Sequence, residues 1–435
     1  MPKIADSWLR HVLALLYQRK TATRAEIVEA TRLNVASVSH TLRQLLKSGT
    51  VLRAGELHSN SGRKPEVIKL SGEAGYFVAV DLEATRIRFG VVNLLGEIRY
   101  RWEEDLEFGQ RLEASRLVDG INRVLHRMTP SERARVLSVG ISCPGFVEKG
   151  DTITAVNLGW LQFPLLAELR NRISLPITAE QDSRIGAFAE HWLGAAQKVS
   201  DCVYVIVGDG IGVASVVDGH VVVGGDRMAG ELGHITIDLQ AEDRCNCGKK
   251  GCLEAICSSP NMVRQYLERS PGRLQSPSRM HVTEVFEMAR AGDVAALAVV
   301  ERTARCLGWA LSHLVHLMNP HLILLGGDIV HGYDLMVPRI QAELHRHCLP
   351  GLMRNLRVQV SSLWPDIGLN GAALVAFRNL LTDPVLLRKL SGLAPIATRE
   401  SPGPPAARLR WVRFAAAPRR TLDRALPLRT GKSTS

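Results

Sequence analysis

The feature that most constrains this chain is residues 230–254, GELGHITIDLQAEDRCNCGKKGCLE, which place three cysteines within eight residues. These are Cys245, Cys247 and Cys252, and His234 stands a short way before them. Cysteines and a histidine at such spacing can close a tetrahedron around a cation, and Zn²⁺ is the usual occupant of sites with this ligand set. The alternative is a loop of incidental small residues. In an intracellular chain this pattern favours a metal over a disulfide, so we predict a structural zinc site.

Two carboxylates lie beside the predicted metal ligands. Glu231 precedes His234 by three residues, and Glu254 follows Cys252 by two. A zinc ion that fixes the histidine also fixes the segments that carry these carboxylates, because groups around a metal orient one another. We therefore expect the zinc to shape a binding pocket.

The motifs G-E-L-G-H at residues 230–234 and C-x-C-G-x-x-G-C-x-E at residues 245–254 resemble the signature of the ROK family. The name covers repressors, open reading frames and sugar kinases, and in that family the zinc supports a sugar site. The resemblance extends over residues 5–390 and implies that Glu231, His234 and Glu254 contact sugar hydroxyls.

Length and charge indicate several domains. A chain of 435 residues exceeds one ordinary core, so two or three domains are expected. The net charge is +11, but residues 1–70 carry +7 and residues 394–435 also carry +7, which leaves −3 for the middle. A basic end on a mildly acidic body is typical of nucleic-acid binding, with a merely solvated surface as the alternative.

The sequence also indicates the compartment. No apolar stretch is long enough to span a bilayer, and the apolar N-terminal run has helical spacing without a signal-peptide cleavage pattern. Eight cysteines, three of them in one predicted metal site, are typical of a protein in a reducing environment. We expect a cytoplasmic protein.

Residues 1–72 are predicted to form a winged helix-turn-helix. Apolar residues at helical spacing mark a first helix, Thr23 and Glu26 form a capping box for a short second helix, and Asn34 can cap a third. A short helix, a tight turn and a helix with a polar, basic outer face is the helix-turn-helix pattern. The side chains that we expect to face DNA are Ser37, Ser39, His40, Arg43 and Lys47.

A predicted hairpin follows the three helices. Residues 51–53 and 67–70 read as strands, and the connection between them carries Arg63 and Lys64 at its tip. Basic side chains on an extended tip can follow phosphates or enter a narrow minor groove. The tip, S-G-R-K-P, also resembles the wing of ROK repressors, which the free-standing kinases of the family lack. A protein-interaction domain is the alternative, and we predict DNA binding.

The rest of the chain is predicted to be an α/β body. Apolar strands and helix-length stretches alternate twice, once over residues 73–190 and again over residues 191–390. Periodicity supports the α/β class, whereas the duplicated actin-like ATPase (ribonuclease-H-like) two-lobe fold is implied by the resemblance. The second lobe would include the zinc motif and a closing helix.

The resemblance also marks a sugar-binding side of the cleft between these lobes. Asp182 occupies the position of the ROK catalytic aspartate, which acts as base or orienting group in the kinases. Gln181 stands where kinases have asparagine, and Arg184 replaces a second asparagine. The full set of predicted sugar-binding residues is Asn157, Gln181, Asp182, Glu231, His234 and Glu254.

The phosphate side departs from the kinase pattern. Phosphates need backbone N–H groups that glycine-rich turns present closely. The first kinase loop resembles Asp-x-Gly-Gly-Thr, but residues 81–85 read Asp-Leu-Glu-Ala-Thr. The second resembles Gly-Thr-Gly-Ile-Gly-Gly-Gly, but residues 208–214 read Gly-Asp-Gly-Ile-Gly-Val-Ala. Added carboxylates repel an anion, so we expect no ATP binding and no kinase activity.

Residues 394–435 are rich in proline, arginine, alanine and serine and lack a sustained periodic pattern. This composition predicts a disordered basic tail, with an auxiliary DNA-binding arm as the alternative.

These observations predict a sugar-responsive transcriptional regulator, a repressor of carbohydrate uptake or catabolism genes that binds a palindromic DNA operator as a homodimer or higher oligomer. A sugar or sugar phosphate in the cleft would shift the angle between lobes or subunits. One alternative is a sugar kinase, with Asp182 as base, that carries a DNA-binding module. Another is a regulator that responds to a protein partner and keeps a vestigial sugar pocket.

Overall fold

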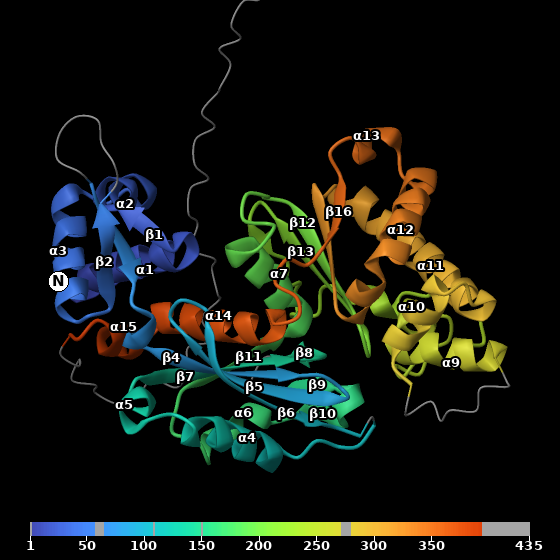
Figure 1. The fold of residues 1–435 in the computed structure, drawn as a ribbon, viewed down its shortest axis with the longest axis horizontal. Coiled ribbons are helices and arrows are strands. Elements are labelled where there is room, and N and C mark those ends of the chain that lie inside the picture. The colour runs from blue at the N-terminus through green and yellow to red at the C-terminus, as the bar shows by residue number, and fades with distance from the viewer. Residues whose placement is uncertain (1, 57–64, 108, 149–150, 271–279, 394–435) are drawn as a thin grey trace, which may run out of the picture.

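The computed structural model describes residues 2–56, 65–107, 109–148, 151–270 and 280–393 (Figure 1). An N-terminal module of helices and a small sheet adjoins a body built on two five-stranded sheets. Over the described residues, every helix is too short or too polar to cross a bilayer.

The N-terminal module has three helices and three strands. They are α1 (Pro2–Arg19), β1 (Thr21–Thr23), α2 (Arg24–Thr31), α3 (Val35–Lys47), β2 (Val51–Glu56) and β3 (Glu66–Leu70), with the sheet order β1-β3-β2. The predicted capping box of Thr23 and Glu26 is confirmed, since each side chain accepts from the other's backbone N–H. Asn34 caps α3 as predicted by accepting from the backbone N–H of Ser37. The strands β2 and β3 form the predicted hairpin, and its tip, with Arg63 and Lys64, lies outside the described residues.

The first lobe is built on the sheet β11-β7-β4-β5-β6. Its strands are β4 (Tyr76–Leu82), β5 (Arg86–Asn93), β6 (Ile98–Asp105), β7 (Val136–Cys143) and β11 (Ile177–Gln181). The helices are α4 (Ala114–His126), α5 (Pro130–Arg133) and α6 (Leu165–Arg170), and a smaller sheet consists of β8 (Phe146–Val147), β9 (Ile153–Ala155) and β10 (Trp160–Phe163). The short helices η1 (Gly72–Ala74) and η2 (Val156–Leu158) lie in connections.

The second lobe repeats this sheet. Read from β6 to β11, the first sheet has two antiparallel pairings followed by two parallel ones. The second sheet, in the order β14-β13-β12-β15-β16, has the same series of directions. Its strands are β12 (Cys202–Val207), β13 (Ile211–Val217), β14 (His220–Val221), β15 (Leu322–Gly326) and β16 (Arg357–Val360). The repeated order confirms the predicted duplicated two-lobe α/β fold, since a chance match of both order and direction over five strands is improbable.

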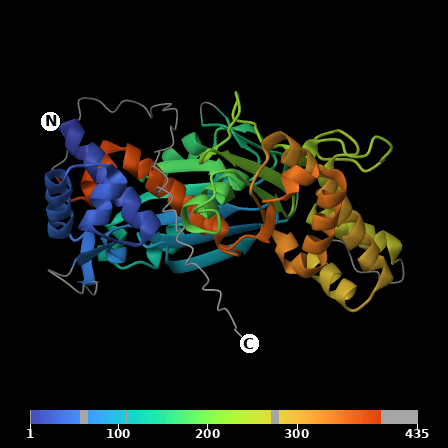
Figure 2. The same ribbon diagram turned by 90° about the horizontal axis from the view of Figure 1, so that it is seen from above.

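Helices complete the second lobe and connect it to the first. They are α7 (Asp182–Leu193), η3 (Leu232–His234), α8 (Leu253–Cys257), α9 (Ser259–Arg269), α10 (Val282–Arg290), α11 (Val294–Met318), η5 (Asp328–Gly332), α12 (Tyr333–His347) and α13 (Pro350–Met353). From above, the helices α9–α12 lie at one end of the molecule and the N-terminal module at the other (Figure 2).

The chain then returns to the first lobe through α14 (Ile367–Thr382) and α15 (Pro384–Leu390). In Figure 1, α14 runs along the sheet that contains β4 and β7. Gly140 on β7 allows this contact, because a Cβ there would lie 2.0 Å from the carbonyl oxygen of Ala372. The closing helix that was predicted within residues 191–390 therefore packs on the first sheet, and the bounds of that lobe remain a prediction. The boundaries at residues 72 and 190 remain predictions.

The N-terminal module shares its core with α14 and α15. Apolar side chains of α1, α2 and α3 form one buried cluster with those of both C-terminal helices. Polar contacts cross the same boundary: Thr50 Oγ1 donates to the carbonyl of Leu390 at 2.6 Å, and Lys20 Nζ donates to the carbonyl of Leu95 at 3.0 Å. The module is therefore packed on the first lobe and is not held by the linker alone.

Candidate functional site

Four side chains come together where the sequence predicts a metal site. One ligand atom from each of His234, Cys245, Cys247 and Cys252 lies within 4.8 Å of the other three. The Sγ atoms of Cys247 and Cys252 are 3.7 Å apart, and Cys245 Sγ is 3.5 Å from His234 Nδ1. At tetrahedral corners around zinc, two sulfurs stand about 3.8 Å apart and a sulfur and a nitrogen about 3.5 Å apart. The donor set and its spacing therefore fit a tetrahedral zinc ion.

Local backbone geometry brings the thiols together. The loop between η3 and α8 is pinned by two isolated bridges, Thr236 with Cys252 and Arg244 with Lys250. Gly251 has φ +69° and lies so close to the carbonyl of Asp238 that a Cβ would be 2.0 Å from that oxygen. Only glycine fits that position without strain.

Glu231 connects the metal cluster to the end of the first sheet. Its Oε2 lies 3.9 Å from His234 Nε2, the ring nitrogen that does not face Cys245. Its Oε1 accepts from Gln181 Nε2 at 3.2 Å. Gln181 is 3% exposed, and its own Oε1 has no partner among the described residues. A buried acceptor of this kind normally has a donor.

Glu254 and Asn157 approach the same loop. Glu254 Oε2 accepts from the backbone N–H of Ile211 at 2.8 Å, and its Oε1 accepts from the Cys245 thiol at 3.9 Å. The loop between η3 and α8, which carries the three cysteines, is called the cysteine loop below. Asn157, on η2 of the first lobe, accepts at Oδ1 from Asn246 Nδ2 of this loop at 3.1 Å. The cysteine loop therefore bridges the two lobes.

Asp182 begins α7, directly after Gln181. Its Oδ1 accepts from the backbone N–H of Ser183 at 2.5 Å. Burial raises the pKa of Asp182 to about 7, and the charges of Asp81 and Glu231 act in the same direction. A carboxyl with this pKa changes protonation near neutral pH, which suits a group that exchanges a proton with a hydroxyl.

Arg184, which stands where kinases have an asparagine, belongs to a network of ion pairs. Its Nε is 3.0 Å from Glu180 Oε1, and its Nη1 donates to the carbonyl of Arg227 at 3.1 Å. Arg227 in turn pairs with Glu180 at 2.8 Å. The guanidinium is therefore in an ion-pair network with Glu180, which sequence reasoning missed because the network also joins Arg227, far away in the chain.

The loop at residues 81–85, which departs from the kinase pattern, holds charged side chains that pair with Arg88. Arg88 on β5 lies directly opposite Asp81 on β4 and donates to it at 2.5 Å, and it also donates to Glu83 at 2.7 Å. Between the lobes, Thr85 Oγ1 donates to Asp209 Oδ2 at 2.9 Å. Arg88 was not among the predicted site residues. A hairpin register that pairs residues 81 and 88 would have been the signal for it.

The predicted DNA-facing side chains of α3 divide into two groups. His40, Arg43 and Lys47 are exposed and Ser39 is half-buried, whereas Ser37 is only 5% exposed. Ser37 lies three residues after the cap and is buried, unlike the other four side chains. Val35 is 61% exposed at the start of the same helix.

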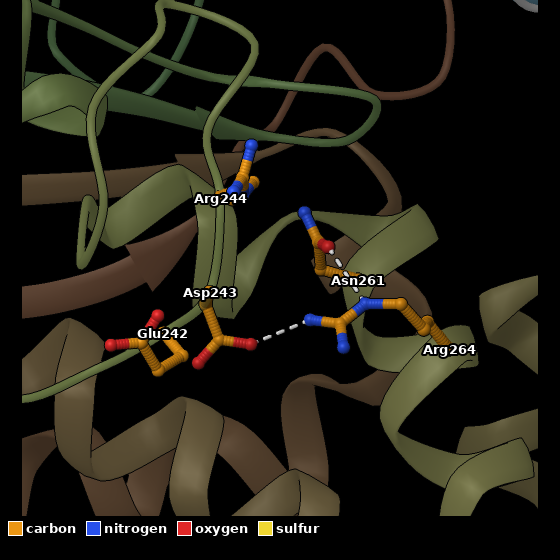
Figure 3. Close-up of a pocket in the computed structure, with 5 residues that line it drawn as sticks. All are labelled: Glu242, Asp243, Arg244, Asn261 and Arg264. Carbon is orange, nitrogen blue, oxygen red and sulfur yellow. Dashed lines mark hydrogen bonds and ion pairs between the residues drawn. The ribbon is translucent and has the colours of Figure 1, made fainter.

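An open pocket of about 400 Å³ lies behind the cysteine loop (Figure 3). It is lined by Glu242, Asp243, Arg244, Asn261 and Arg264. An ion pair occupies its wall, since Arg264 Nη2 donates to Asp243 Oδ1 at 2.7 Å. None of the predicted sugar-binding residues lines it, so it is distinct from the site around Gln181 and Glu231.

Comparisons with known proteins agree on one family. A family model described as ROK family matches residues 77–379. A putative xylose repressor of Caldicellulosiruptor sp. is 28% identical over 385 residues, which cover 86% of this chain and 96% of that protein. A glucokinase of Halalkalibacterium halodurans is 31% identical over 310 residues, which cover 68% of this chain and 93% of that protein. A crystal structure of a ROK family transcriptional regulator, a homolog of the E. coli MLC protein, superposes with a TM-score of 0.72 at 25% identity and covers 88% of this chain and all of its own.

Proposed function

The chain belongs to the ROK family, and we propose that it is a sugar-responsive transcriptional regulator that represses carbohydrate genes by binding an operator. The observation that carries this proposal is the N-terminal module packed on the kinase-like body. Relatives named as repressors match 86% of the chain, whereas the glucokinase matches 68%. We propose that the protein is cytoplasmic, because it must reach the DNA that contains its operator.

We assign operator binding to the exposed face of α3. His40, Arg43 and Lys47 offer donors and positive charge on one side of a helix that follows a tight turn. Such a helix enters the major groove, where donors read base edges and cations contact phosphates. The wing residues Arg63 and Lys64 would add contacts beside it. We propose that two copies of the chain bind one palindromic operator.

We propose that the sugar binds beside the metal cluster, at the side chains of Asn157, Gln181, Asp182, Glu231, His234 and Glu254. The unpartnered Oε1 of buried Gln181 supports this site, because a sugar hydroxyl would supply the missing donor. Zinc would hold His234 and the cysteine loop, and thereby fix Glu231 and Glu254 toward the sugar. Its contribution would be structural, since four protein ligands leave no open coordination position.

The coupling between the two sites would run through α14. Its first turn packs against Asp81 in the cleft, where a Cβ on Gly368 would lie 2.0 Å from the carboxylate. Farther along, Phe377 contacts Tyr17 of the module. A sugar that changes the angle between the lobes would therefore move the module together with the first lobe. In a dimer this movement would change the distance between the two α3 helices.

The second candidate is a sugar kinase that carries the same module. The pKa of Asp182, raised to about 7 by burial, would suit a base at neutral pH, and the glucokinase relative is 31% identical. The acidic side chains on the phosphate side weigh against ATP binding. An assay of ADP release with a panel of sugars tests this candidate. The regulator proposal predicts no sugar-dependent turnover, whereas turnover that Asp182→Asn abolishes would support the kinase.

A further inference from the structure

A small cavity lies where elements of both lobes meet the helices α7 and α14. Its volume is about 10 Å³, which is room for one group about the size of a water molecule. The two helices pack on each other, and both contribute to the wall of the cavity. The wall includes Glu180 of β11, Arg184 and Phe188 of α7, Val221 of β14, and Val375 and Arg378 of α14. A group bound here would therefore lie between the first lobe and the second.

Arg184 brings a buried cation to this wall. Its side chain is 2% exposed, its Nε forms an ion pair with Glu180 at 3.0 Å, and its Nη1 donates to the carbonyl of Arg227 at 3.1 Å. Its Nη2 has no hydrogen-bond partner among the described residues. A guanidinium keeps its charge at every physiological pH, and a buried charged donor without an acceptor is destabilising. An acceptor in the cavity would satisfy Nη2.

The wall of the cavity also favours negative charge in its occupant. Arg184 and Arg378 both line the cavity, whereas Glu180 is the one carboxylate in its described lining. Glu180 also pairs with Arg227 at 2.8 Å, so two guanidinium groups share this single anion. Burial lowers the pKa of Arg378 to about 10, with the charge of Glu180 acting against this change and that of Arg227 in its favour. Surroundings that disfavour a cation in this way are stabilised by a further anion.

We propose that the cavity binds one monatomic anion, chloride among the common ones, beside Arg184 Nη2. A water molecule would supply an acceptor there but no compensating charge, and a phosphate or a sugar acid exceeds the volume of the cavity. The bound anion ties α7 and α14 to both lobes, so it sets part of the cost of lobe movement. The site depends on Arg184, which stands where kinases have an asparagine. It needs only the folded chain, so its test is independent of the proposed function.

The test is thermal unfolding of the full-length protein in sodium chloride and in sodium gluconate at the same ionic strength. Gluconate screens surface charges as chloride does, but it is too large for the cavity. The unfolding midpoint of wild type should rise by about 2 °C as about 200 mM chloride replaces gluconate, and the rise should saturate as it does for one site. In crystals grown with bromide, an anomalous peak should lie beside Arg184 Nη2.

Two variants should abolish the rise. Arg184→Asn removes the guanidinium, and Val375→Ile keeps every charge but fills the cavity with one more carbon. Arg346→Asn is the matched control and should keep the rise, because this arginine is 65% exposed on α12. If Arg184→Asn does not fold, Val375→Ile decides. The proposal is overturned if chloride fails to raise the midpoint of wild type above that in gluconate, which would mean that water fills the cavity. It is also overturned if either folded variant responds to chloride as wild type does.

Discussion

The rings of Tyr17 and Phe377 stack with centroids 4.1 Å apart and planes at 19°, so α1 of the DNA-binding module packs directly on α14 of the body. Phe377 also meets Phe77 of β4 edge-on at 6.1 Å, which extends the contact to the first sheet. A module held this way moves with the first lobe, because buried aromatic pairs are packed at the density of a protein core. This contact is where the proposed response to sugar would reach the operator.

Tyr17→Ala should loosen the module from the body. Removal of a buried aromatic ring typically costs about 3–5 kcal/mol, and the loss should appear as a lower urea midpoint and a weaker effect of sugar on operator affinity. Tyr17→Phe is the control. The Tyr17 hydroxyl is buried without a partner among the described residues, so its removal should leave stability unchanged or slightly higher. A loss in Tyr17→Phe as large as that in Tyr17→Ala would contradict this account of the contact.

Gly368→Ala tests the other end of α14. The added methyl group would lie 2.0 Å from Asp81 Oδ2, and that carboxylate is held by Arg88. The first turn of α14 must shift, at a cost of about 1–3 kcal/mol, and the sugar concentration that releases the operator should change. Gly351→Ala is the matched control, since a Cβ there meets nothing within 4 Å. Identical release curves for wild type and Gly368→Ala would argue against α14 as the connection.

Metal analysis tests the cysteine cluster. The wild-type protein should hold about one zinc ion per chain, and Cys247→Ser should lose it because serine is a poor ligand for zinc. Cys306→Ser, outside the cluster, should retain the metal. Loss of metal should also weaken sugar binding, since His234 and the loop before Glu254 would no longer be fixed. A wild-type protein that is folded and free of metal would refute the site.

The raised pKa of Asp182 predicts a pH-dependent stability. The carboxyl keeps its proton in the folded chain up to about pH 7, whereas the unfolded chain loses it near pH 4. Between these values the folded state binds more protons, so the contribution of Asp182 to stability falls as pH rises. Asp182→Asn cannot ionise. Its free energy of unfolding relative to wild type should therefore be about 2–3 kcal/mol higher at pH 8 than at pH 5. An equal difference at both pH values would mean that Asp182 titrates normally.

Arg43→Ala should weaken operator binding about tenfold, because it removes a cation and its donors from the exposed face of α3. If Arg43 contacts a phosphate, the slope of log affinity against log salt should also become shallower by about one. Ser37→Ala should change affinity less than about twofold, since Ser37 is buried. Fluorescence anisotropy with one operator fragment measures all three proteins, and equal loss in both variants would contradict the assigned face.

The sequence predicted well the features that depend on neighbouring residues. Short-range hydrogen bonds form the capping box of Thr23 and Glu26 and the cap at Asn34. The spacing of the three cysteines likewise indicated the loop that brings their thiols together. The repeated strand order followed from the family resemblance. The features that sequence reasoning missed depend on contacts between distant residues: the return of α14 to the first sheet, the Arg88–Asp81 pair and the Thr85–Asp209 hydrogen bond. Asp209 was predicted to repel a phosphate, but its partner in the other lobe could not be read from one chain segment.

The central claim is that this chain binds an operator and that a sugar controls the binding. The most direct measurement is a gel shift of the full-length protein on the DNA upstream of its own gene, with and without a panel of sugars and sugar phosphates. Our account predicts a specific complex that one of these compounds releases, and loss of that release in Asp182→Asn or Glu231→Gln. A protein that fails to bind this DNA and instead phosphorylates a sugar would contradict it.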